Sequence, residues 1–134
     1  MPRPIGRFVA RRKSSVAASE EWFRKARRNL RVANANLEAG FADVAAFYAQ
    51  QAAEFALKGL QIHRTGRFAR IHDLTRLSRD LSAPPMIVKL AAFVTPAYIA
   101  ARYPDAAGKI TRRLAESMIE AARRIVRWVR RQMD

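Results

Sequence analysis

Polar side chains recur along one short, otherwise apolar stretch of the chain. Gln51, Glu54 and Lys58 are spaced three and four residues apart, so a helix would place them on one face. The row brings together an amide, a carboxylate and an ammonium group. On a solvated surface such a row would be ordinary, but among so many apolar neighbours it indicates polar groups held at a packed junction or a site. Two interpretations stay open: a helix-stabilising pair formed by Glu54 and Lys58, or a charged cluster that contacts a ligand.

A second group of chemically useful residues follows half a chain later, at Arg102, Tyr103, Pro104 and Asp105. Pro104 favours an extended conformation for Tyr103, and Arg102 and Asp105 are placed to pair across the turn. The alternative is a segment that merely ends a helix.

Histidine is scarce, and His72 is the one candidate for acid–base chemistry. An imidazole can act as a general base near neutral pH, and a neighbouring arginine can stabilise negative charge that develops in a reaction. His72 would be the base, with Arg67 or Arg102 as the cation. The alternative is that His72 and Asp73 begin a helix and that the imidazole bonds to a backbone or a neighbouring side chain. Because the chain has no cysteine and only two histidines, we expect neither a metal site nor a cofactor.

Charge points to a polyanionic partner. The 134 residues carry 26 Lys and Arg against 11 Asp and Glu, a formal net charge of +15. Arginine dominates, and its planar fork suits phosphate oxygens. The alternative is an arginine-rich surface of the thermophile type, but ion-pair networks of that kind usually carry matching acids. No secretory signal or long apolar run is present, so we expect a cytoplasmic protein without a membrane segment.

The periodicity of apolar residues predicts five helices and no strand. Residues 1–18, rich in Arg and Lys with Pro and Gly, are expected to form a flexible basic arm, and residues 19–134 a helical domain. Ser19 is expected to begin the first helix and Gly40 to end it. Later helices are expected at about 43–64, 74–81, from 86 with a kink at Pro96, and 111–132. Four long helices and one short one make an all-α, up-and-down bundle.

Taken together, these features resemble the HEPN family (higher eukaryotes and prokaryotes nucleotide-binding domain) in its small stand-alone prokaryotic form. The matching elements are Gly40 to Asp43, Gln50 to Glu54 with Lys58, Gly66, His72 to Leu74, and Tyr98 with Arg102 to Asp105. The resemblance covers roughly residues 19–131. It implies a five-helix bundle, usually a homodimer, often paired with a minimal nucleotidyltransferase as a toxin–antitoxin system.

Many HEPN proteins are metal-independent ribonucleases whose signature is an Arg followed, after four to six residues, by a late His. No histidine lies downstream of Arg102, and the only string of that form is Arg67 with His72. We therefore expect a binding module for a nucleotide or RNA, with Lys58 and Arg102 on phosphate and Tyr103 stacked on a base. The alternatives are an endoribonuclease toxin with an atypical site, and a structural helical dimer for protein–protein contact. The expected binding residues are Gln51, Glu54, Lys58, Arg102, Tyr103 and Asp105.

Overall fold

The protein is an all-helical bundle. The computed structural model describes residues 5–105 and 109–134, the stretch 5–14 by its backbone alone. The described residues form five helices and one additional single turn, α5, with no strand among them, which confirms the all-α, five-helix bundle. The elements are α1 (Ile5–Glu38), α2 (Ala42–Thr65), α3 (Leu74–Asp80), α4 (Pro85–Val94), α5 (Ala97–Ala100) and α6 (Arg112–Met133).

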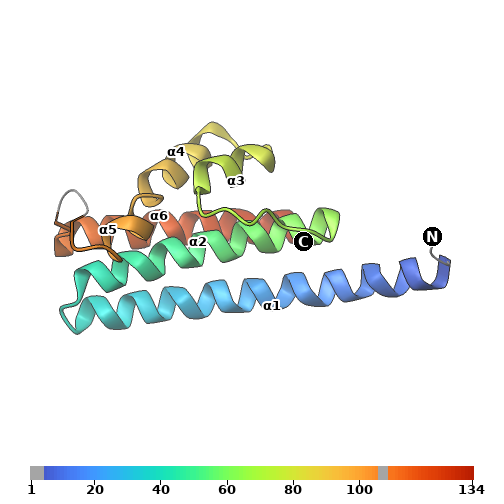
Figure 1. The fold of residues 1–134 in the computed structure, drawn as a ribbon, viewed down its shortest axis with the longest axis horizontal. Coiled ribbons are helices and arrows are strands. Elements are labelled where there is room, and N and C mark those ends of the chain that lie inside the picture. The colour runs from blue at the N-terminus through green and yellow to red at the C-terminus, as the bar shows by residue number, and fades with distance from the viewer. Residues whose placement is uncertain (1–4, 106–108) are drawn as a thin grey trace.

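Helix α2 is the centre of the bundle. It lies between α1 and α6, and the shorter helices α3 to α5 cover its remaining side (Figure 1). Six of its alanines are completely buried, so their small side chains let neighbouring helices approach on several faces. At Gly59 the approach of α1 is so close that an added Cβ would lie 3.3 Å from Trp22 Cβ. The alanine-rich composition of this helix therefore reflects its central position.

The start of the first helix differs from the prediction. The backbone is helical from Ile5, and Ser19 lies inside α1 and not at its beginning. The Ser19 hydroxyl donates to the carbonyl oxygen of Val16 at 2.7 Å, a bond within the helix that satisfies a side chain otherwise suited to a cap. Residues 1–4 of the predicted arm, including Arg3, lie outside the described residues. The flexibility of the arm and its separation from the helical domain remain predictions.

Most other helix ends follow from local chemistry. Gly40 and Gly66 adopt left-handed φ angles of 89° and 79° where α1 and α2 end, as their positions in the sequence indicate. Asp73 accepts a hydrogen bond from the Thr75 amide at 3.0 Å and caps α3. The kink expected at Pro96 is instead a break, because α4 ends at Val94 and α5 begins only at Ala97.

Two connections bring distant residues to α2. After Gly66 the chain runs back along α2 before α3 begins, which carries His72 to the middle of that helix. The turn after α4 then places α5 against α2. None of the described helices is both long enough and apolar enough to span a bilayer.

Candidate functional site

The core of the site is a buried row of polar side chains on α2. Gln50, Glu54 and Lys58 are each at most 4% exposed. The Lys58 ammonium donates to Glu54 Oε2 at 3.0 Å, and the Gln50 amide nitrogen donates to Glu54 Oε1 at 3.0 Å. Charges removed from water in this way are tolerated only when paired and hydrogen-bonded, and here both conditions hold. Two members of the predicted row, Glu54 and Lys58, therefore lie at a packed junction, whereas Gln51 is only half-buried and Gln50 takes its place in the buried row.

His72 is the third hydrogen-bond partner of the Glu54 carboxylate. Its Nδ1 lies 3.0 Å from Glu54 Oε1 and 3.1 Å from Oε2, and the Gln50 amide also donates to the His72 carbonyl oxygen at 3.2 Å. Because a carboxylate offers only acceptors, Nδ1 carries the hydrogen in this contact. Nε2 has no partner in the described part of the chain, and the side chain is 51% exposed. The imidazole is thus fixed from below and open to solvent at its other edge.

The same imidazole is stacked on an aromatic ring. The ring centroids of His72 and Tyr98 are 4.2 Å apart and their planes differ by 15°. Arg102 Nη1 donates to the Tyr98 hydroxyl at 2.6 Å, and the Arg102 guanidinium carbon lies 5.8 Å from the centroid of Tyr103. We call the four side chains of His72, Tyr98, Arg102 and Tyr103 the stacking surface. Three of them are exposed, and Tyr98 is half-buried.

Lys58 contacts an aromatic ring that is not part of the stacking surface. Besides its bond to Glu54, its ammonium lies 5.5 Å from the centroid of Phe68, and Arg70 approaches the same ring at 5.3 Å. The side chain is only 6% exposed. In this conformation Lys58 neutralises Glu54 and is almost completely buried, and its contact with a phosphate remains a prediction.

The structure brings together only some of the residues singled out in the sequence. Glu54, His72, Arg102 and Tyr103 lie in one neighbourhood, with Gln51 attached through its amide, which donates to Gln50 Oε1 at 2.7 Å.

The side chains of Arg67 and Asp105 form no hydrogen bond or ion pair with this group among the described residues. The Arg67 side chain is exposed and has no contact with His72 in the described residues. Asp105 is likewise exposed, and within the described ranges it forms no ion pair with Arg102. The residues that follow it, 106–108, lie outside those ranges.

Two members of the site were given no role from sequence. Gln50 lies four residues before Glu54, and Glu54 lies four residues before Lys58. This even spacing predicts the buried row better than the spacing of three and four that includes Gln51. Tyr98 lies four residues before Arg102, and this spacing was likewise available. Nothing local could have shown that His72 is the ring stacked on it. No group of three or more His, Asp or Glu side chains suited to a metal ion occurs among the described residues.

Comparisons with known proteins agree on the family. The sequence profile of the HEPN domain matches residues 19–132. No curated protein sequence matches the chain significantly.

Solved structures that share the fold include the following three. The protein TT1696 from Thermus thermophilus is 36% identical, with a TM-score of 0.78 over 84% of this chain and 96% of that one. The archaeal HEPN homologue ST0689 is 34% identical, with a TM-score of 0.73 over 87% and 98%. An HEPN domain protein from Thermotoga maritima is 26% identical, with a TM-score of 0.68 over 84% and 97%.

Proposed function

The chain belongs to the HEPN domain family, and on that premise we propose that it binds a nucleotide or single-stranded RNA at the stacking surface. Arg102 would hold a phosphate, and Tyr103 and the His72–Tyr98 stack would receive bases. The observation that carries the proposal is the parallel stack of His72 and Tyr98 at 4.2 Å with Arg102 bonded to its edge.

Such an arrangement suits nucleic acid for two physical reasons. Aromatic faces bind any base by stacking, and an arginine guanidinium can donate two parallel hydrogen bonds to the oxygens of one phosphate. The surface is also pre-organised, because Glu54 is buried beneath it and holds His72 by Nδ1. A ligand would therefore not need to order these rings on binding, which favours affinity.

The net charge of +15 supports the same ligand class. A polyanion is attracted to the whole molecule and releases counterions when it binds, so affinity is expected to fall steeply with salt.

We further propose that the protein is a homodimer formed through the face of α4 and α5. Met86, Phe93 and Ile99 are exposed there. In residues 81–101, Lys89 is the only charged residue, so two copies could meet on this face without the repulsion expected from their basic surfaces. Tyr98 belongs to the same short helix as Ile99, which would place the stacking surfaces of both copies beside the interface.

The family resemblance supports a second partner, a minimal nucleotidyltransferase acting with this chain in the cytoplasm as a toxin–antitoxin-type pair. Co-purification of the two proteins after joint expression tests this partnership. Separate elution at matched concentrations would argue against it.

Binding to a labelled single-stranded oligouridine, measured by fluorescence anisotropy, tests the ligand class. Arg102→Ala and Tyr103→Ala should each weaken binding by about tenfold or more, as for the loss of one phosphate fork or one stacking ring. Arg113→Ala and Phe41→Ala are the matched controls, since both side chains are exposed and lie elsewhere. Equal losses in test and control variants would contradict the proposal, and absence of binding would favour a helical dimer that serves only protein contact.

A metal-independent endoribonuclease is the second candidate, favoured by the contact between Glu54 and His72. A carboxylate bonded to Nδ1 orients the imidazole and leaves Nε2 free to take a proton from a ribose hydroxyl. Arg102, bonded to the tyrosine that stacks on His72, would stabilise the negative charge that develops on the phosphate. RNA cleavage in the presence of a chelator, lost in His72→Ala at an RNA concentration that still saturates the variant, would establish the enzyme. Unchanged cleavage in that variant would exclude His72 as the base.

A further inference from the structure

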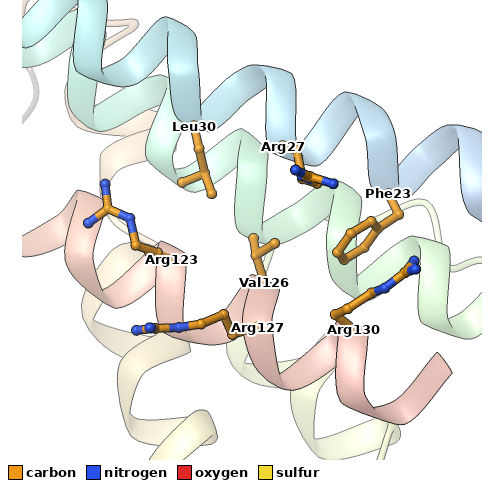
Figure 2. A pocket seen from close by; sticks show the side chains of 7 residues that line it. All are labelled: Phe23, Arg27, Leu30, Arg123, Val126, Arg127 and Arg130. Atoms are coloured by element: carbon orange, nitrogen blue, oxygen red, sulfur yellow. The ribbon is translucent and has the colours of Figure 1, made fainter. Parts of the chain in front are cut away.

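A groove between α1 and α6 shares no residue with the stacking surface. It has a volume of about 240 Å³ and is lined by residues of these two helices only. Figure 2 shows Phe23 and Leu30 of α1 and Val126 of α6 pointing into the space between the helices. Four arginines surround this apolar floor: Arg27, Arg123, Arg127 and Arg130.

Two of these arginines, Arg27 and Arg127, retain much of their capacity to bind anions, whereas Arg130 already pairs with Glu20 at 3.4 Å and with Asp134 at 3.6 Å. Arg27 has no partner in the described part of the chain. Arg127 has a single ion pair, with Glu120 at 3.6 Å, and shares that carboxylate with Arg123, which lies closer at 2.6 Å. Since each guanidinium offers five N–H donors, the arginines of the rim can donate hydrogen bonds to several further carboxylates.

We propose that the groove binds an acidic amphipathic helix of a partner protein. A third helix lying along α1 and α6 would insert apolar side chains between Leu30 and Val126 and place its carboxylates against the arginine rim. The complementarity is twofold, apolar in the centre and charged at the edges, as in protein interfaces generally.

Two other occupants fit the groove less well. RNA would need an open aromatic face, but the guanidinium of Arg130 lies 5.2 Å from the centroid of Phe23, the only ring of the floor, and the other two floor side chains are aliphatic. A second copy of the chain would bring another strongly basic surface against this one. The aliphatic floor and the positive rim together therefore favour an acidic protein segment.

Anisotropy titrations at physiological ionic strength with two labelled helical peptides test the proposal. The first is a designed peptide with a leucine stripe flanked by glutamates, and the second has alanine in place of leucine at the same net charge. The leucine peptide should bind and the alanine peptide should bind more weakly.

The protein variants separate the groove from general charge. Arg27→Glu with Arg127→Glu should weaken the leucine peptide by about tenfold or more. Arg28→Glu with Arg124→Glu, which changes the same charge at neighbouring exposed positions outside the groove, should change it by less than about twofold. Oligouridine binding should fall equally in the two double variants, since Arg102 is untouched in both.

Four results would overturn the inference. These are no peptide binding, equal binding of the two peptides, equal weakening in the two double variants, or an oligouridine affinity that falls only in the groove variant while peptide binding is unchanged. The last result would assign the groove to RNA.

Discussion

Removing the charge of Glu54 should destabilise the fold far more than its pairing with Lys58 would suggest. Glu54→Gln leaves Lys58, whose side chain is 6% exposed, without an anion in the interior. Breaking a buried pair in this way typically costs about 3–5 kcal/mol, a large share of the roughly 5–15 kcal/mol that stabilises a typical protein.

The opposite change should cost less, because the two partners are not supported equally. In Lys58→Met the carboxylate keeps the Gln50 amide at 3.0 Å and His72 Nδ1 at 3.0 Å as donors. We therefore expect a loss of about 2–3 kcal/mol. The double variant Glu54→Gln with Lys58→Met buries no charge and should recover most of the loss, leaving about 1 kcal/mol because a neutral amide is a weaker acceptor than the carboxylate for Gln50 and His72.

Urea unfolding of the four proteins measures these free energies in a double-mutant cycle. The control is Glu116→Gln, which breaks the Arg112–Glu116 pair: it has the same i,i+4 spacing and a similar 3.1 Å distance, but both side chains are more than half exposed. That variant should lose less than about 1 kcal/mol. A loss in Glu54→Gln no larger than in the control, or a double variant as unstable as the sum of the single ones, would refute the reasoning.

Three further predictions concern single positions. Gly66→Ala should lower the free energy of unfolding by about 1–2 kcal/mol in urea, because φ is 79° and an added Cβ would lie 3.1 Å from Ser15 Oγ; an unchanged midpoint would contradict this. Asp73→Ala should cost about 1 kcal/mol in thermal unfolding by removing the cap of α3, whereas Asp73→Asn should be nearly neutral, and equal losses would argue against a capping role. Tyr98→Phe removes only the hydroxyl that accepts from Arg102, so oligouridine affinity should fall by about fivefold with little change in melting temperature; unaltered affinity would show that Arg102 needs no such anchor.

Sequence periodicity was sufficient where the determining interactions are local. The apolar spacing and the glycines at 40 and 66 located the ends of α1 and α2 within a few residues, because these signals act within one helix turn. The start of α1 was missed for a related reason. A serine followed by acids is equally compatible with a cap and with a helix interior, and Ser19 satisfies its hydroxyl inside the helix.

The contacts of the candidate site also fall into local ones, which the sequence predicts, and tertiary ones, which it does not. The sequence by itself determined that Glu54 and Lys58 meet, since four residues of helix leave them adjacent. Only the tertiary structure decided that the pair is buried, and that His72, eighteen residues away, bonds Glu54 and stacks on Tyr98. Those contacts depend on the return of the chain after Gly66 and on the packing of α5 against α2, which are set by how whole helices bury their apolar faces and not by the spacing of residues within any one of them.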